Sequence, residues 1–225
     1  MRSTRPTSDP HRDCPLCPRL TSFRGDNRAA EPAWHNAPVA SFGSPDARLL
    51  IVGLAPGLKG ANRTGRPFTG DFAGDLLYAT LLAFGFARGR YGASPDDGLE
   101  LVDCRITNAV RCVPPANKPT PQEIGTCRDF LAATIAEMPR LAAIVCLGRI
   151  AHDSVATALG IKRSAMPFGH GARHDVRPGL IVTDSYHCSR YNTNTGVLTE
   201  AMFQDVFRAV ADDLAGRKVA AVQKR

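Results

Sequence analysis

The sequence predicts an α/β domain with a mainly parallel sheet. Apolar runs and helical patterns alternate along the chain, which is the arrangement of successive βα units. The apolar runs are continuous rather than alternating, as expected of strands that are buried on both faces. Four such runs are predicted to be strands: residues 49–53, 106–110, 143–147 and 180–183.

Helices are predicted between the strands from their apolar faces and their end signals. Residues 75–84 carry apolar side chains on one face and end at Gly85. Thr120 and Glu123 form a capping box with a proline at the first helical position, which predicts a helix to about Met138. Two further helices are expected, at 149–159 and near 199–214.

Length and composition indicate a single domain. The 225 residues suit one domain, which we place at 14–215, and the 44% hydrophobic content supports a real core. We expect a disordered N-terminal tail at 1–13 and a basic C-terminal tail at 216–225. No apolar run is long enough to cross a membrane, and the start lacks the apolar segment of a secretory signal. The expected location is therefore the reducing cytoplasm of a bacterium or archaeon, at the nucleoid.

The charge of the chain suits a polyanionic partner. The net charge is +7 and the isoelectric point is about 9.3, and each phosphate that a cation neutralises releases counterions and adds affinity. A protein with surplus surface arginine would carry the same charge. Charge alone therefore leaves both interpretations open.

Seven cysteines in a reducing compartment argue against a disulfide framework and for metal-binding or core roles. Cys14 and Cys17 form a close pair near the start, Cys112 follows the second predicted strand, and Cys127 lies in the second turn of the capped helix. Four thiolates arranged in this way suit a [4Fe–4S] cluster or a tetrahedral zinc, and spacing does not separate the two. The alternative is that all four fill the core. The remaining cysteines are interpreted as structural: Cys104, Cys146 and Cys188.

A long loop after the first predicted strand carries candidates for a ligand site. Residues 54–74 are long for a connection in an α/β unit, and they begin at the carboxyl end of a strand, where open sheets place their ligands. Glycines and a proline at 53–57 let backbone amides approach a ligand, although a tight turn explains them equally well. Phe68 could stack on a base or anchor the loop. Asp71 could activate water or cap the next helix.

Further candidates accompany the second and fourth predicted strands. Asn108 lies inside an apolar strand, where its amide could read a pyrimidine edge or make a structural hydrogen bond. A proline-rich loop at 114–119 then holds Asn117 and Lys118. His187 follows the fourth strand and could donate a hydrogen bond to a leaving base, although a lone histidine is more often structural.

The order and spacing of several motifs resemble the iron–sulfur branch of the uracil-DNA glycosylase superfamily, and within it family 5, the B-type enzymes. The resemblance runs from Cys14 to about Phe207. Family 4 enzymes are similar but carry a glutamate where this chain has Leu54, which favours family 5. The motifs are CPLC, GLAPG, GANRTGRPFTGD, TNAVRCVPPANKPTP, CLGRIA and SYHCSRYNTNTG.

The resemblance implies a three-layer α/β/α fold around a four-stranded, mainly parallel sheet. It also implies base-excision repair of double-stranded DNA, in which a monomer hydrolyses the N-glycosidic bond of uracil and of other deaminated or modified bases, such as hypoxanthine. Its product would be an abasic site. The cofactor would be a [4Fe–4S] cluster held by Cys14, Cys17, Cys112 and Cys127.

The resemblance and the residue chemistry together define a predicted site. Asp71, Asn117 and His187 match the catalytic positions of family 5, and Asp71 would handle the water that Leu54 cannot. The predicted base-binding residues are Gly53, Leu54, Ala55, Pro56, Gly57, Phe68 and Asn108. The predicted DNA contacts are Asn62, Arg63, Arg66, Lys118, Ser189, Arg190 and Asn192.

Two other classes of protein are alternatives to a glycosylase. One is an iron–sulfur protein that binds nucleic acid without cutting it, which only an activity measurement separates from an enzyme. The other is a nucleotide enzyme of the Rossmann type, which is disfavoured because no GxGxxG follows a strand and no Walker lysine is present. No lysine is placed for a Schiff base, so we expect hydrolysis without strand cleavage.

Overall fold

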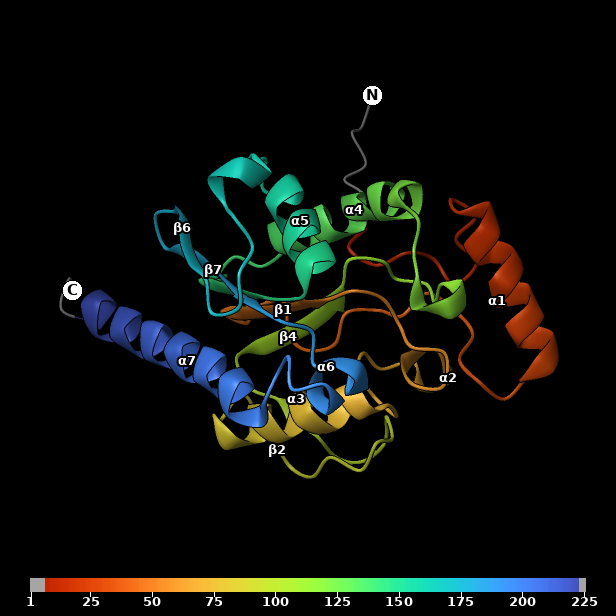
Figure 1. The fold of residues 1–225 in the computed structure, drawn as a ribbon, viewed down its shortest axis with the longest axis horizontal. Helices are drawn as coiled ribbons and strands as arrows, with labels where there is room; N and C mark the ends of the chain where they lie inside the picture. Colours follow the sequence, from red (N-terminus) through yellow and green to blue (C-terminus); the bar gives the residue numbers. More distant parts are fainter. Residues whose placement is uncertain (1–6, 223–225) are drawn as a thin grey trace.

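The computed structural model describes the backbone of residues 7–222 and shows three layers, with a central sheet between two layers of helices (Figure 1). The sheet has five strands in the order β4-β1-β5-β7-β6. The first four of these are parallel to one another, which confirms the predicted α/β fold. The strands are β1 (Leu49–Gly53), β4 (Cys104–Asn108), β5 (Ala143–Leu147), β6 (Arg173–Arg177) and β7 (Leu180–Ser185).

The fifth strand, β6, is a correction to the four predicted strands. It pairs antiparallel with β7 at the edge of the sheet, and its side chains alternate between exposed and half-buried. Its sequence is mostly charged, so it lacks the continuous apolar run that marked the other four strands. A separate two-stranded sheet pairs β2 (Ala87–Arg88) with β3 (Glu100–Leu101).

The two faces of β1 explain how the layers are held together. Leu49 and Ile51 belong to one core cluster, which includes side chains of α3 (Phe72–Ala83) and α7 (Glu200–Val222). Leu50 and Val52 belong to a second cluster, with side chains of α4 (Pro121–Ala136) and α5 (Arg149–Ala158). Because successive side chains of a strand point to opposite faces, an uninterrupted apolar run serves both clusters.

The helix ends follow the sequence signals closely. The Thr120 hydroxyl accepts the Glu123 N–H at 3.2 Å, and the Glu123 carboxylate accepts the Thr120 N–H at 2.8 Å, which confirms the capping box. Helix α3 begins at Phe72, three residues earlier than predicted, because the Asp71 side chain accepts the Gly74 N–H as its N-cap.

Several helical elements lie in segments for which no helix was predicted. Helix α1 directly follows the first cysteine pair, and its apolar face is short, with only Leu20 as a buried hydrophobic side chain. The others are one or two turns long. The full set of helical elements without a predicted helix is α1 (Pro18–Ala30), α2 (Ala61–Thr64), α6 (Arg190–Asn194), and the 3-10 turns η1 (Pro115–Asn117) and η2 (Arg163–Ala165).

The N-terminal segment is packed against the domain from residue 7 onward, which corrects the predicted disordered tail for 7–13. Arg111 is fully buried, and its guanidinium donates to the Asp9 carboxylate at 2.8 Å and to the Ser8 carbonyl at 3.1 Å. Residues 1–6 lie outside the described part of the chain. At the other end, α7 continues through the predicted tail boundary at 216 to Val222, and 223–225 are not described.

No helix among the described residues is both long and apolar enough to cross a bilayer.

The Asp9–Arg111 pair, in which Arg111 is fully buried and Asp9 is partly exposed, should contribute more to stability than an exposed pair does. Asp9→Asn leaves a buried guanidinium without its counter-ion, so we expect the free energy of unfolding to fall by about 2–4 kcal/mol. Glu100→Gln is the matched control, because it breaks the exposed ion pair with Arg88 and should cost less than about 1 kcal/mol. Denaturant unfolding measures both values, and equal losses in the two variants would contradict the role of Asp9.

Candidate active site and four-cysteine cluster

A cavity of about 760 Å³ opens where β1, β4 and β7 end. Parallel sheets bind ligands at this edge. The sheet order places β1 between β4 and β5, so the topological switch point of the sheet lies beside β1. The volume lies within the range of small-molecule sites. The residues that line it are Leu54, Ala55, Pro56, Gly57, Lys59, Ala61, Phe68, Gly70, Asp71, Phe72, Ala73, Asn108, Asn117, His187, Ser189 and Arg190.

The floor of the cavity is built by close packing at the end of β1. Gly53 pairs in register with Asn108 on β4. A Cβ atom on Gly53 would lie 2.4 Å from the Asn108 Oδ1 and 2.4 Å from the Phe68 ring, so only glycine lets both side chains approach the strand. The Asn108 Oδ1 is buried and has no hydrogen-bond partner among the described residues. An unpaired buried acceptor of this kind is stabilised by a ligand that donates to it.

Asp71 caps the next helix and also lines the cavity. Its Oδ1 caps α3, and its Oδ2 lies against the backbone of Gly57 and Gly60, where a Cβ atom would come within 2.8 and 2.3 Å. Burial raises the pKa of the Asp71 carboxyl above its usual range, although the N–H groups of Gly74 and Ala73 partly offset this. A carboxylate held at the cavity wall with a raised pKa has the character of a general base.

His187 lines the same cavity as Asp71 and packs near Phe68. The two ring centroids are 6.1 Å apart and the ring planes are 28° from parallel. Burial lowers the pKa of His187 to about 4, so the imidazole is neutral at physiological pH. Its Nδ1 is buried and unpartnered within the described chain, and the Asn192 amide donates to the His187 carbonyl at 2.8 Å, which fixes this loop.

Asn117 is held at the cavity by an uncommon backbone conformation. Ala116 and Asn117 both have left-handed φ values, 52° and 56°, directly after the proline pair that begins η1. Asparagine tolerates this region better than most residues do. Asn117 is exposed at the rim rather than buried in the floor.

Two of the predicted DNA contacts are wrong because their side chains are internal. Arg66 is only 5% exposed and forms an ion pair with Asp97 at 2.7 Å, and its guanidinium also lies over the Tyr78 ring. Asn62 is 1% exposed and donates to the Asn36 amide oxygen at 2.9 Å. Both side chains hold the long loop to the domain and neither is available to a ligand.

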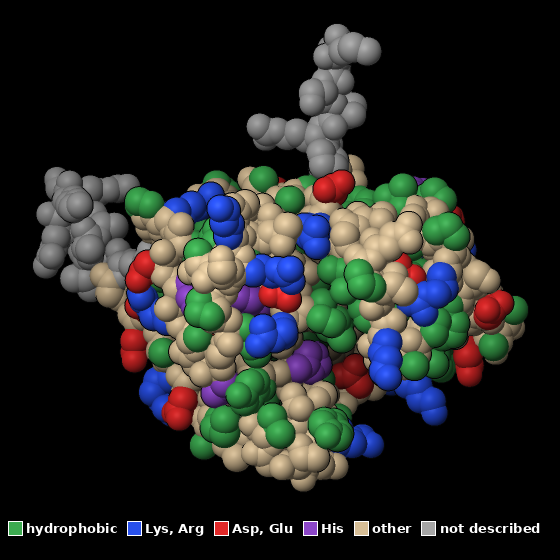
Figure 2. Space-filling model, turned by 45° about the horizontal axis from the view of Figure 1, so that its top comes forward, with side chains coloured by type: hydrophobic (Ala, Val, Ile, Leu, Met, Phe, Trp, Pro, Cys, Tyr) green, Lys and Arg blue, Asp and Glu red, His purple; other side chains and the backbone are tan. Residues whose placement is uncertain are grey.

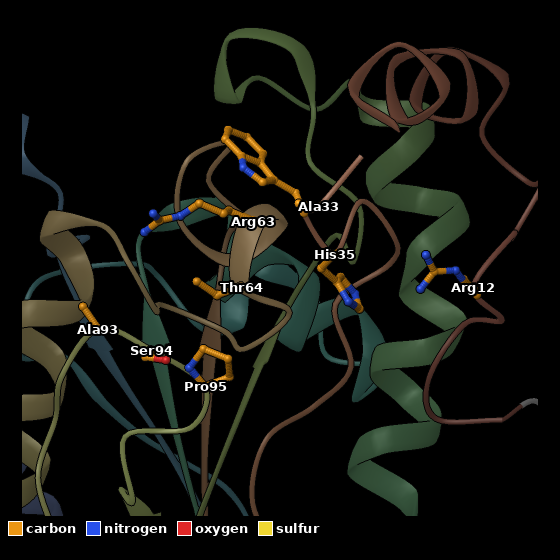
Figure 3. A pocket seen from close by; sticks show the side chains of 9 residues that line it. Arg12, Ala33, His35, Arg63, Thr64, Ala93, Ser94 and Pro95 are labelled. Carbon is orange, nitrogen blue, oxygen red and sulfur yellow. The ribbon is translucent and has the colours of Figure 1, made fainter. Parts of the chain in front are cut away.

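Only two of the other predicted DNA contacts line the cavity. Ser189 and Arg190 line the cavity, and the Arg190 guanidinium lies over the Phe72 ring. Arg63 is exposed but lines a neighbouring cavity of about 510 Å³ instead, together with Trp34, His35 and Arg12 (Figure 3). Lys118 is exposed and is not part of the lining.

Sequence reasoning missed five residues of the lining: Lys59, Ala61, Gly70, Phe72 and Ala73. All five lie in the predicted functional loop, so the length of the loop was the available signal. Lys59 is exposed at the cavity, and the expectation that no lysine is placed for a Schiff base stays a prediction. On the face shown in Figure 2, Lys and Arg side chains surround a hollow in which histidine and acidic side chains lie next to one another.

Four cysteines from three separate parts of the chain converge on one small pocket. Cys14, Cys17, Cys112 and Cys127 all line it, and none of them forms a disulfide. The Arg111 N–H donates to the Cys127 sulfur at 3.3 Å, at the edge of this pocket.

The surroundings of this pocket suit a set of metal-bound thiolates. The Arg24 side chain is buried and donates to the Cys112 sulfur at 3.6 Å. Such donors stabilise negative charge on sulfur, and burial keeps solvent away from it. The donor set is all sulfur, which fits either an iron–sulfur cluster or a closed zinc site.

The remaining cysteines are fully buried, as predicted: Cys104, Cys146 and Cys188. They belong to the two core clusters that pack the faces of the sheet. His152, on α5, is also buried, with 1% of its surface exposed.

Comparison with known proteins places this fold and this site in one family. The model of the uracil DNA glycosylase superfamily matches residues 40–211, and the chain therefore belongs to that superfamily. Within it, the chain is 45% identical to the type-5 uracil-DNA glycosylase of Thermus thermophilus, over 90% of this chain and 94% of the relative.

Other relatives separate the type-5 branch from type 4. The type-5 enzyme of Pyrobaculum aerophilum is 39% identical over 89% of each chain. The type-4 enzymes of Archaeoglobus fulgidus and Thermotoga maritima are each 38% identical, over 50% and 76% of this chain, so the type-5 relatives match more of it. The chain is thus a type-5 member of the superfamily, in agreement with the family 5 assignment that Leu54 favoured.

Proposed function

We infer that this protein is a uracil-DNA glycosylase of base-excision repair, which hydrolyses the N-glycosidic bond of uracil in DNA. The observation that best supports this function is that one cavity is lined by the unpartnered Asn108 amide oxygen, the Phe68 ring and the Asp71 carboxylate. The full-length similarity to enzymes named for this activity supports the same conclusion.

Recognition begins with extrusion of the target base, because its glycosidic carbon cannot be reached inside a duplex. The Phe68 ring provides a stacking surface for the extruded base. The Asn108 Oδ1 accepts the N3–H of a uracil, which satisfies an acceptor that is otherwise buried and unpaired. At the opening, Arg190 and Ser189 are positioned to contact the phosphates of double-stranded DNA.

Cleavage of the bond leaves negative charge on the base and positive charge on the sugar. The neutral His187 donates a hydrogen bond to the base oxygen as charge develops there, assisted by backbone amides of the loop after β1. The Asp71 carboxylate stabilises the sugar cation and accepts a proton from the attacking water. Asn117, at the rim, helps to position that water. The products are a free base and an abasic site.

The four converging cysteines would hold a [4Fe–4S] cluster. When bound, such a cluster cross-links the N-terminal segment, the loop after β4 and α4, and every ligand position is filled by a protein thiolate. The Arg24 and Arg111 donors would stabilise its charge. The cluster pocket and the base cavity share no lining residue, so the cluster has a structural role in this proposal.

Asp71→Asn should reduce the single-turnover rate on a uracil-containing duplex by about 100-fold to 10,000-fold. Asparagine caps helices as well as aspartate does, so the variant keeps α3 and loses only the carboxylate. Binding to abasic DNA should persist. Asp75→Asn, at an exposed position in the same helical turn, is the matched control and should retain its rate. A wild-type rate in Asp71→Asn would refute the role of the carboxylate.

The rate should also fall in acid as Asp71 becomes protonated. Because burial raises the pKa of this carboxyl, the loss should begin at a higher pH than the ordinary aspartate value of 3.8 implies. His187 stays neutral until about pH 4 and does not account for a loss above that value. A single-turnover pH profile measures the effect, and a flat profile down to pH 4 would contradict it.

The purified protein should contain about four iron atoms per chain and absorb broadly in the visible region. Cys127→Ser should lose iron and stability, because it removes one thiolate of the set. Cys104→Ala is the matched control, since Cys104 is equally buried but lies outside the cysteine pocket, and it should keep its iron. A colourless protein that contains zinc would overturn the iron assignment.

A panel of duplexes that carry uracil, hypoxanthine, xanthine or hydroxymethyluracil would define the substrate range. We expect abasic-site formation on uracil opposite guanine, because a mismatched base costs less to extrude, and the panel would rank the other bases. Borohydride should trap no covalent complex, since Lys59 is exposed at the rim and water is the nucleophile. DNA binding without abasic-site formation on any duplex would favour a non-catalytic nucleic-acid-binding protein.

A further inference from the structure

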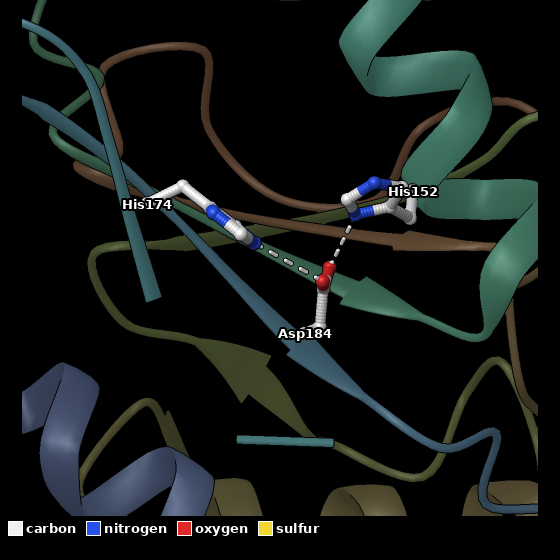
Figure 4. Close-up of side chains that lie close together, drawn as sticks. All are labelled: His152, His174 and Asp184. Atoms are coloured by element: carbon white, nitrogen blue, oxygen red, sulfur yellow. Dashed lines mark hydrogen bonds and ion pairs between the residues drawn. The ribbon is translucent and has the colours of Figure 1, made fainter. Parts of the chain in front are cut away.

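A second group of potential metal ligands lies at the other edge of the sheet, outside the base cavity and the cysteine pocket. His152 on α5, His174 on β6 and Asp184 on β7 point toward one another (Figure 4). One ligand atom from each lies within 4.8 Å of the other two. His152 and Asp184 are buried, and the His174 side chain is 15% exposed.

The hydrogen bonds of His152 require a proton or a metal ion between its Nδ1 and Asp184. Its Nε2 lies 2.8 Å from the Met166 carbonyl oxygen, which can only accept, so Nε2 carries a hydrogen. Its Nδ1 lies 2.7 Å from the Asp184 Oδ1. In a neutral imidazole the Nδ1 lone pair would face an anionic carboxylate. Either a proton or a metal ion must therefore lie between these two atoms.

A proton shared by His152 and Asp184 leaves the other two ligand atoms of the group without a hydrogen bond. The His174 Nε2 and the Asp184 Oδ2 face each other at 3.5 Å, and neither has a hydrogen-bond partner among the described residues. Two ligands of a tetrahedral zinc ion are about 3.3 Å apart, given bonds of about 2.0 Å. The separation of these two atoms is thus close to that of a pair which shares a metal ion.

We propose that the protein binds one Zn²⁺ ion through the His152 Nδ1, the His174 Nε2 and the Asp184 carboxylate. Two imidazoles and one carboxylate suit zinc better than they suit magnesium or calcium. Binding widens the His152–Asp184 contact by about half an ångström, and a water molecule or the second carboxylate oxygen completes the coordination.

The surroundings of these residues match those of a structural metal site. The Met166 carbonyl fixes the tautomer of His152, as the partners of metal-binding histidines commonly do. The partly exposed His174, on the edge strand, provides the path for entry of the ion. None of the three ligands lines the base cavity, so the ion ties together α5, β6 and β7 rather than taking part in bond cleavage.

The test is a calorimetric titration of Zn²⁺ into the iron-loaded protein, with thermal unfolding measured in parallel. We expect one zinc per chain with unchanged iron content, and a rise in Tm of several degrees, because a ligand that binds only the folded state stabilises it. His174→Ala removes the most exposed ligand and should fold normally. It should lower the zinc affinity at least tenfold and abolish the rise in Tm.

The control variant is His170→Ala, which removes a histidine that is close in sequence but does not belong to the group. It should retain both the affinity and the rise in Tm. Zinc uptake that is equal in His174→Ala and wild type, or that releases iron in proportion, would place the metal at the cysteines and overturn the proposal. Absence of zinc binding would also overturn it, and would leave a proton as the cation shared by His152 and Asp184.

Discussion

The close contact of Phe68 and Asn108 with the backbone of Gly53 is the constraint on which the base cavity depends. Gly53 ends β1 and pairs with Asn108 on β4, and a methyl group at this point would overlap both side chains. Phe68 reaches the strand end only because its own backbone adopts a left-handed φ of 53°. Such a conformation costs about 1–2 kcal/mol, so it must be stabilised by its surroundings.

The buried contacts of the long loop provide that stabilisation. The Tyr78 hydroxyl donates to the Pro67 carbonyl at 2.6 Å, and the Arg66–Asp97 pair is buried beside it. On the other side, Gly74 packs so closely on the Phe68 carbonyl that a Cβ atom there would be 1.8 Å away. The loop is thus fixed at both sides of Phe68, and the same packing carries Asp71 to the N-terminus of α3 and to the cavity wall.

The sequence was sufficient for the parts of the fold that are repetitive and apolar. The strands at 49–53 and 143–147 were predicted with the observed bounds, because each is an uninterrupted apolar run. Strand β6 was missed because its charged side chains are held at a sheet edge by pairing with β7, which is a tertiary effect. The residues predicted in loops at the strand ends also meet at one cavity, since position at the carboxyl end is readable from sequence.

The errors among the predicted DNA contacts have one physical cause. Arg63 and Arg66 are three residues apart in the same loop, yet the first is exposed and the second is buried. The difference lies in Asp97, which is distant in sequence and supplies the counter-ion that makes burial of Arg66 possible. Spacing cannot reveal such a partner. The convergence of the cysteines is equally long-range, but thiols carry a chemical signature that two similar arginines lack.

Both proposed metal sites would act on the cavity through the loops that they anchor. Asn117 lies between Cys112 and Cys127, so the loop that presents it is held at both ends by the proposed cluster ligands. His187 follows Asp184 by three residues, at the end of the same strand. The loop after β1, in contrast, has no metal ligand and is fixed by the packing of Phe68. In this proposal, the three loops that converge on the cavity are thus immobilised by three different means, and loss of any one would misplace a different predicted catalytic residue while the sheet remained intact.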